Sequence, residues 1–383
     1  MKKLSFIFLS FLAILICNTN EILAEEDQNK YFVTFKSEVN ENYIKSNGAE
    51  IVKCFTTSPT VLIKASEKAV ANIQSNENIV SAIEPDEEVV ASDVDFDISE
   101  IDLDPQEQLI PWNVNYIKAP TLHKLGLSGK KIKIGIIDSG IADHKDLNVV
   151  DGINILDHNS NFRDDFGHGT KVAGVIGALN NSYGLVGVAP DSNLYAIKVL
   201  NSKGKGSISN VVSGIEYAIE KNLDIVNLSL QTTTNNSVLK KTIEKAYENN
   251  IVIVAAAGNK GGDKGSNTVT YPALYDEVIS VGAINHNGKR YALSSIGQID
   301  LVAPGEYVYT TVLDDMYFLY HGTSMATPHV VGVAALLLEH NSSLKNRDIK
   351  NILMNSATDI GDFEIYGKGV LNAEKAFDLT KKY

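Results

Sequence analysis

The sequence predicts an α/β fold: a doubly wound, mostly parallel sheet preceded by a small α+β domain. From Gln108 onwards, short runs rich in β-branched residues alternate with longer helical stretches, as in βαβ units. These runs show no polar alternation, which is typical of parallel strands buried on both faces. An acidic stretch without Lys or Arg, residues 84–107, separates this pattern from the shorter elements before it. We therefore expect domains over 25–92 and 108–383, joined by an acidic linker over 93–107.

The net charge restricts the partners of the chain. Its 383 residues carry a formal net charge of −13, and 44% of them are hydrophobic. An acidic protein is repelled by nucleic acid and by anionic membrane surfaces, so we exclude both as partners. We expect a globular monomer without a stable membrane anchor.

Residues 1–24 have the pattern of a secretion signal. Lys2 and Lys3 precede an apolar run, and the small Ala24 offers a cleavage position. The run is shorter than the roughly 20 residues that a membrane-spanning helix needs. A lipid anchor at Cys17 is the weaker alternative, because the bulky Ile16 precedes it. We expect a secreted protein.

The sequence contains two cysteines, Cys17 and Cys54, and the first lies within the predicted signal. The exported chain would keep one thiol and could form no internal disulfide. We expect core packing and bound ions to stabilise it.

Both domains contain elements that the sequence pattern predicts. In the small domain we expect strands over 31–35, 60–65 and 79–85 and helices over 39–48 and 66–76, the second capped by Ser66. In the large domain we expect strands over 131–138, 193–200, 223–230, 251–258 and 278–284 and helices over 209–222 and 236–250. A doubly wound sheet carries its site at the carboxyl ends of the strands.

Three candidate catalytic residues lie at such strand ends or helix starts. Asp138 ends an apolar strand, His168 lies between two glycines at a helix opening, and Ser324 begins an apolar helix. A serine hydroxyl is a poor nucleophile at neutral pH, so it needs a base and a group that orients this base. Taken singly, each residue is more often a helix cap or a surface residue. The surrounding sequence decides between these interpretations.

The segments KIGIIDSGI, DDFGHGTKVAGVI and HGTSMATPHVVGVAALLLEH resemble those of subtilisin-like serine proteases. The resemblance covers residues 108–383, and residues 31–92 resemble the propeptide domain that assists folding and then inhibits. It implies that His168 is the general base and acid, that Asp138 fixes its tautomer, and that Ser324 is the nucleophile. Metal binding by His168 is disfavoured, because no second His or Cys pair stands at ligand spacing.

The resemblance also implies how the enzyme binds its substrate. Asn259 and the Ser324 backbone N–H would bind the developing oxyanion. An extended polypeptide substrate would pair with two cleft edges, around Gly204 and Leu230. The propeptide would act as an intramolecular inhibitor, and no organic cofactor is expected.

The predicted substrate pocket departs from that of broad-specificity relatives. Gln231 and Thr232 stand where two glycines are usual, and Thr270 replaces a glycine that usually leaves the main pocket deep. Lys260 follows Gly258 and Asn259 at the pocket rim, and Lys205 lies at the cleft edge. A narrow pocket with an ammonium at its mouth would favour a carboxylate before the cleaved bond. The alternative is that both lysines are solvated surface charges.

The predicted role is that of a selective maturation protease. Proteases that trim leader peptides from lanthipeptide precursors resemble this chain in size, acidic linker and compact catalytic domain. Some of them cut after Glu and others after Arg, and the two lysines argue against the Arg type. The alternatives are a broadly degradative protease and a non-catalytic peptide-binding protein, which would be expected to lose a triad residue.

A calcium-binding loop is predicted within the stretch GALNNSYGLVGVAP, which resembles the family's ion loop. The resemblance implies a structural Ca²⁺ bound by the side chains of Gln108, Asp146 and Asn181 and by the carbonyl oxygens of Leu179, Tyr183 and Leu185. Ligation by oxygen with few carboxylates suits this ion. The alternative is an Asn-rich turn without an ion.

Self-cleavage is predicted in the acidic linker, after Glu100. The linker contains no basic residue, which excludes an Arg-specific or Lys-specific enzyme from processing itself there. Glu107 is the poorer choice, because the adjacent Gln108 is a predicted calcium ligand that needs free chain before it.

Overall fold

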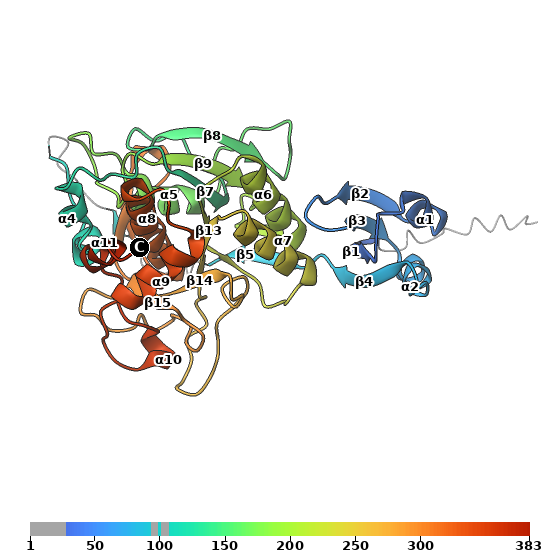
Figure 1. The fold of residues 1–383 in the computed structure, drawn as a ribbon. Helices are drawn as coiled ribbons and strands as arrows, with labels where there is room; N and C mark the ends of the chain where they lie inside the picture. The colour runs from blue at the N-terminus through green and yellow to red at the C-terminus, as the bar shows by residue number, and fades with distance from the viewer. Residues whose placement is uncertain (1–27, 93–98, 101–106) are drawn as a thin grey trace, which may run out of the picture.

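The computed structural model describes residues 28–92, the backbone of residues 99–100, and residues 107–383. The predicted signal with its cleavage position Ala24, and most of the predicted linker, lie outside these residues. A small N-terminal domain lies beside a large C-terminal domain (Figure 1). Within the described ranges, no helix is long and apolar enough to cross a membrane.

The N-terminal domain is a four-stranded antiparallel sheet with two helices. Its strands are β1 (Asn29–Phe35), β2 (Glu50–Cys54), β3 (Thr60–Ala65) and β4 (Val80–Pro85), in the order β2-β3-β1-β4. Helices α1 (Glu41–Ser46) and α2 (Glu67–Gln74) are capped by the side chains of Asn40 and Ser66, which accept backbone N–H groups. Val33, Ile44, Ile63 and Ile73 form its core.

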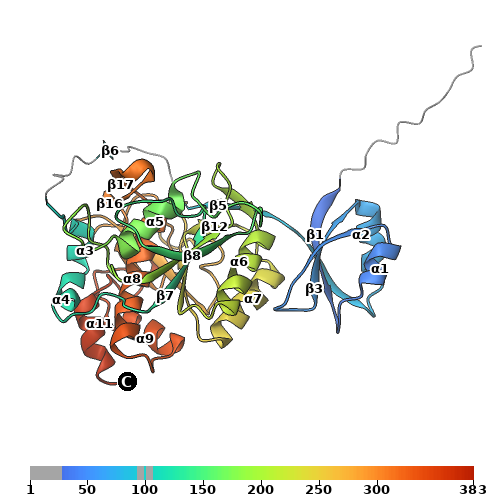
Figure 2. The same ribbon diagram turned by 90° about the horizontal axis from the view of Figure 1, so that it is seen from above.

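The second face of this sheet packs on the large domain. Phe32, Phe55 and Leu62 belong to the same apolar cluster as residues of α6 (Ile208–Glu220) and α7 (Ser237–Glu248). Both figures show the small domain next to these two helices (Figure 2). Burial of apolar side chains therefore fixes how the two domains meet.

The large domain is built on seven parallel strands. Their order is β15 (Leu301–Pro304), β14 (Val278–Ile284), β13 (Val252–Ala256), β11 (Ile225–Leu228), β7 (Lys133–Asp138), β9 (Asn193–Lys198) and β8 (Val149–Asn154). In β7, Ile134 and Ile136 join the core that contains α5 (His168–Gly177) and α8 (Thr323–His340), whereas Ile137 joins the core of α6 and α7. Helices thus cover both faces, and the predicted doubly wound α/β fold is confirmed.

Shorter elements complete the domain. The helices are α3 (Trp112–Tyr116), α4 (Ala119–His123), α9 (Asn346–Ser356), α10 (Phe363–Tyr366) and α11 (Ala373–Thr380), with a 3₁₀ turn at Leu313–Asp315. One small sheet has the order β10 (Lys205–Ser207), β5 (Glu88–Ala91), β12 (Leu230–Gln231). The other has the order β16 (Val308–Thr311), β17 (Tyr317–Tyr320), β6 (Ser99–Glu100).

Candidate active site

The glycines on both sides of His168 match the backbone at the start of α5. Gly167 precedes the helix with a φ of 97°, a left-handed conformation that favours glycine. At Gly169, a Cβ would overlap the Gly140 carbonyl oxygen and would lie 3.2 Å from Asp138 Cβ. The absence of side chains here lets the imidazole pack directly against the end of β7.

Asp138 and His168 form a buried hydrogen-bonded pair. His168 Nδ1 lies 2.7 Å from Asp138 Oδ1, and both side chains are fully buried. An ionised carboxylate can only accept, so the proton on Nδ1 belongs to the imidazole and Nε2 becomes its basic nitrogen. The Ser139 backbone N–H donates to the same Oδ1 at 2.7 Å. The carboxylate is thereby oriented and holds one histidine tautomer.

Ser324 and Asn259 converge on one carbonyl oxygen. Ser324 lies buried in the first turn of α8, and its Oγ donates to the Ser92 carbonyl oxygen at 2.6 Å. Asn259 Nδ2 donates to the same oxygen at 2.6 Å. Asn259 Oδ1 accepts from the Thr323 backbone N–H at 3.0 Å, which fixes the orientation of the amide. A hydroxyl and an amide donor are thus preorganised around a peptide carbonyl.

The chain's own N-terminal segment occupies the predicted substrate cleft. Strand β5 lies antiparallel between β10 and β12. The paired residues are Lys205 with Val90, Gly206 with Val89, Ser207 with Glu88, Leu230 with Ala91, and Gln231 with Val90. The pairing continues where the Ala91 and Ser92 N–H groups donate to the carbonyls of Gly204 and Ser229, both at 3.0 Å. The segment is bound as an added strand.

The Ser92 side chain is enclosed. It is 0% exposed, and its hydroxyl has no hydrogen-bond partner among the described residues. Near Asn259, Thr270 Oγ1 donates to Gln231 Oε1 at 3.4 Å. A Cβ at Gly258 would lie 2.8 Å from Thr270 Oγ1 and 3.0 Å from Gln231 Oε1. The two side chains therefore fill the space next to Gly258, beside Asn259.

The structure corrects the expectation for Lys205. Its Nζ contacts the carboxylate of Glu88 at 3.0 and 3.2 Å, and both side chains are exposed. Lys205 therefore faces a position of the bound strand upstream of Ser92 and not the residue next to Ser324. Lys260 is exposed at the surface, and its backbone N–H donates to Ser295 Oγ at 3.3 Å.

The structure also corrects the expectation for Glu100. The backbone of Ser99 and Glu100 forms β6, which pairs with Leu319 and Phe318 of β17. The carbonyl at Ser324 belongs to Ser92 instead. The physical reason is the docking of the small domain on α6 and α7, which brings the chain that follows β4 directly into the cleft.

The predicted calcium ligands are brought together around Gln108. Its Nε2 lies 2.6, 2.8 and 3.1 Å from the carbonyl oxygens of Leu179, Tyr183 and Leu185 and 3.2 Å from Asn181 Oδ1. An amide NH₂ has two protons, so four acceptors exceed what it can satisfy. Such an excess of oxygen atoms fits a cation that prefers oxygen ligands.

Asp146 lies next to this cluster in a fully buried position. Its carboxylate accepts from Asn181 Nδ2 at 3.1 Å, from the Leu185 N–H at 2.9 Å and from the Tyr317 hydroxyl at 3.2 Å. Burial raises the pKa of Asp146 to about 6. Across the described ranges, no group of three or more His, Cys, Asp or Glu side chains could hold a metal. Carbonyl and amide oxygens would have to supply most of the ligands.

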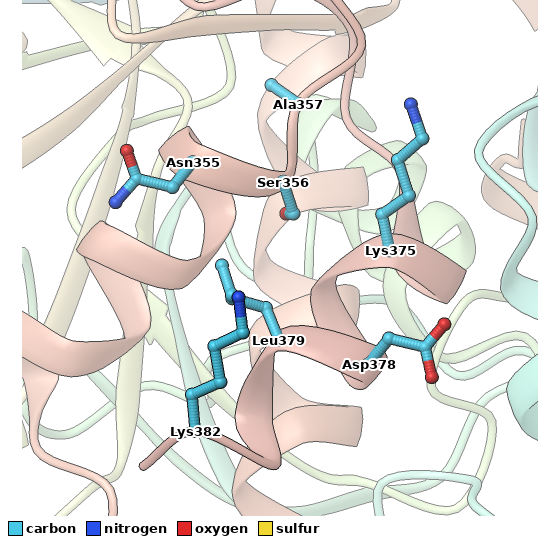
Figure 3. Close-up of a pocket in the computed structure, with 7 residues that line it drawn as sticks. All are labelled: Asn355, Ser356, Ala357, Lys375, Asp378, Leu379 and Lys382. Carbon is cyan, nitrogen blue, oxygen red and sulfur yellow. The ribbon is translucent and has the colours of Figure 1, made fainter.

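A separate surface pocket lies at α9 and α11 (Figure 3). It is lined by Asn355, Ser356, Ala357, Lys375, Asp378, Leu379 and Lys382. Lys375 Nζ donates to Thr358 Oγ1 at 3.1 Å, and Asp378 accepts from Lys381 at 2.7 Å. None of these residues belongs to the site around Ser324.

Sequence reasoning missed three residues of the site. Ser92 supplies the bound carbonyl, and its signal was the β-rich run EVVAS directly after the small domain. Ser229 Oγ donates to the Ser324 carbonyl at 3.0 Å. Lys198, a lysine at the end of an apolar strand, is buried beside the residue that follows Asp138.

An α/β fold with a buried Asp–His pair, a serine at a helix start and an amide donor defines a serine peptidase. A profile of the subtilase family matches residues 129–369. The chain is 46% identical over 271 residues to subtilisin DY of Bacillus licheniformis, a match that covers 70% of this chain and 99% of the relative. It is 38% identical over 359 residues to subtilisin NAT of Bacillus subtilis subsp. natto, covering 91% and 90%. It is also 38% identical over 360 residues to M-protease of Shouchella clausii, covering 92% of each chain.

The chain therefore belongs to the subtilase family and is a subtilisin-like serine endopeptidase.

Proposed function

We propose that Ser324, His168, Asp138 and Asn259 carry out peptide hydrolysis in this enzyme. Ser324 Oγ attacks the carbonyl carbon while His168 Nε2 takes the hydroxyl proton, and His168 returns this proton to the leaving amine. Water then hydrolyses the acyl-enzyme with the same base. Asn259 donates to the oxygen as it becomes negative, and losing such a donor typically costs about 3–4 kcal/mol.

The observation that carries this proposal is the Ser92 carbonyl held by both Ser324 and Asn259. A fluorophosphonate, which reacts with activated serines, tests it. We expect peptide mapping to find the label on Ser324, and we expect His168→Ala to abolish labelling. Labelling of another serine, or undiminished labelling of His168→Ala, would contradict the assignment.

The chain is further proposed to be a zymogen that cuts itself between Ser92 and Asp93. Support comes from the backbone pairing of β5, which carries Ser92 into the cleft as a substrate would enter it. This replaces Glu100 as the proposed processing position. After the cut, the new carboxyl terminus at Ser92 would stay in the cleft as long as the N-terminal domain remains bound.

The N-terminal domain is proposed to be the inhibitory propeptide. Asp86 accepts from the Ser209 N–H at 2.8 Å in the first turn of α6, and Glu84 accepts from the Ser237 N–H at 2.9 Å at the start of α7. Carboxylates at helix N-termini are stabilising. Glu216 of α6 accepts in turn from the N–H groups of two threonines of the small domain. These contacts would hold the domain on the enzyme after cleavage.

A small, uncharged residue is proposed before the cleaved bond. The enclosed Ser92 side chain and the contact between Thr270 and Gln231 support this preference. The alternative preference for Glu loses the support of Lys205 and depends on Lys260 alone. Two peptides that differ only in Ser or Glu at this position distinguish the preferences by their kcat/KM values.

The proposed biological role is that of a selective maturation protease, with leader removal from a lanthipeptide precursor as the specific case. A pocket reduced by Thr270 and Gln231 supports selectivity over broad degradation. Rapid digestion of casein at many positions would contradict this role. Cleavage of a precursor at one bond would support it.

A structural calcium ion is proposed at Gln108, Asn181 and the carbonyl oxygens of Leu179, Tyr183 and Leu185, with Asp146 beside them. The four acceptors around Gln108 Nε2 support this site. The ion would stabilise the loop and take no part in the chemistry.

The protein is further proposed to be exported through the signal at residues 1–24 and to be a monomer. Detection of the protein in culture medium without residues 1–24 would test the first, and light scattering the second.

A further inference from the structure

Lys198 is a buried lysine at the end of the strand that pairs with the Asp138 strand. It is the last residue of β9, and its register partner in β7 is Asp138. The residue is only 4% exposed. The Val199 and Leu200 N–H groups both donate to the Asp138 carbonyl oxygen, at 2.7 and 3.1 Å. The two strand ends are thus joined beside the catalytic carboxylate.

The Lys198 ammonium has three acceptors for its three protons. Nζ donates to the Ser139 carbonyl at 2.6 Å, to the Leu200 carbonyl at 3.0 Å and to Asp165 Oδ1 at 2.5 Å. Burying an ammonium is costly unless it is paired and hydrogen-bonded, and this one is both.

These acceptors belong to the two segments that carry Asp138 and His168. Ser139 directly follows Asp138, and its Oγ accepts from the Gly169 N–H at 2.9 Å. Asp165 lies in the loop directly before His168. One ammonium therefore contacts the backbone next to the carboxylate and a side chain of the loop that presents the imidazole.

We infer that Lys198 is a positioning residue that holds the Asp138 and His168 segments in their reactive arrangement. The inference rests on the proposed roles of Asp138 and His168. A purely structural lysine would affect folding stability alone, whereas a positioning lysine sets the geometry in which the proton is transferred. A displacement of the reacting groups by about 1 Å can lower the rate a hundredfold, even when the substituted residue does not touch the substrate.

The test compares Lys198→Met with Lys198→Arg in the full chain after self-processing. Active-site titration with a sulfonyl fluoride gives the enzyme concentration, and a soluble peptide gives kcat and KM. We expect Lys198→Met to lower kcat by about tenfold to a hundredfold with KM changed less than about twofold. Arg keeps the charge and supplies donors, but its guanidinium is larger and planar, so Lys198→Arg should recover only part of the kcat that Lys198→Met loses. Lys221→Met, which removes a half-buried lysine paired with Asp151, is the matched control.

A wild-type kcat in Lys198→Met, or a loss confined to KM, would overturn the inference. If Lys198→Met yields no folded enzyme, Asp165→Asn provides the test. This substitution weakens only the contact between Lys198 Nζ and the exposed Asp165 side chain. A lower kcat at unchanged Tm then supports the inference, and an unchanged kcat overturns it. Ser324→Ala tests the proposed triad separately: activity close to that of the wild type there would refute the triad, whatever Lys198 does.

Discussion

The carbonyl oxygen of Ser92 lies 2.6 Å from the hydroxyl oxygen of Ser324, so the segment that leaves the small domain contacts the nucleophile of the large one. Strand β5 holds this contact through backbone hydrogen bonds on both of its edges. The proposal that this segment is first the substrate and then the inhibitor depends on this contact.

Replacing Ser324 by Ala should stop self-processing without unfolding the protein. The substitution removes the nucleophile and leaves the apolar packing of α8 intact, so we expect full-length protein with a Tm close to that of the wild type. Gel electrophoresis and thermal unfolding measure both properties, with Ser343→Ala, an exposed serine, as the control. Normal processing of Ser324→Ala would disprove the assignment of the nucleophile.

Replacing Ser92 by Glu should slow self-processing, whereas Glu100→Gln should leave it unchanged. A larger side chain in an enclosed site typically costs about 1–3 kcal/mol, which corresponds to a reaction slower by roughly fivefold to 150-fold. Ser92→Ala should process normally, because the Ser92 hydroxyl has no hydrogen-bond partner in the described structure. The rate at which full-length chain disappears provides the measurement. Faster processing of Ser92→Glu would support the Glu preference instead.

Neutralising Glu84 and Asp86, whose carboxylates accept from the first turns of α7 and α6, should release the N-terminal domain sooner. A negative charge near a helix N-terminus typically contributes about 0.3–1 kcal/mol, so Glu84→Gln and Asp86→Asn together should weaken binding by roughly threefold to thirtyfold. The lag between cleavage of the chain and appearance of full activity should shorten accordingly. Glu77→Gln, an exposed residue of the same domain, is the control. An unchanged lag would show that these two carboxylates do not hold the domain.

Removing calcium should lower the Tm. A site filled at a hundredfold excess over its Kd contributes about 2.7 kcal/mol, which corresponds to a fall of roughly 5–10 °C in a domain of this size. Scanning calorimetry with and without a chelator measures the fall, and Asn181→Leu should lose the sensitivity to the chelator. A Tm that does not respond to the chelator in the wild type would contradict the proposed site.

The sequence predicted the apolar central strands and missed the edge strands β2 and β8, for a physical reason. Strands such as β7 and β13 are buried on both faces and therefore appear as continuous apolar runs. Strand β8 is largely half-buried, and β2 alternates between exposed and half-buried positions, so neither has such a run. Strand β5 depends on β10 and β12, which are distant in the chain, and no local pattern reports that pairing.

The positions of Asp138, His168 and Ser324 could be predicted because their backbone requirements leave local marks, such as the glycine at 167 with its positive φ. The identity of Ser92 as the residue whose carbonyl accepts from Ser324 Oγ could not be predicted in the same way. It depends on how the small domain docks on α6 and α7, and this depends on buried residues such as Phe32 and Phe55 of the small sheet.

The N-terminal sequence of the self-processed enzyme, with the intact mass of the released fragment, tests the central claim most directly. We predict that the mature chain begins at Asp93 and that the released fragment ends at Ser92. A mature chain that begins at Ile101, with a fragment ending at Glu100, would contradict the account.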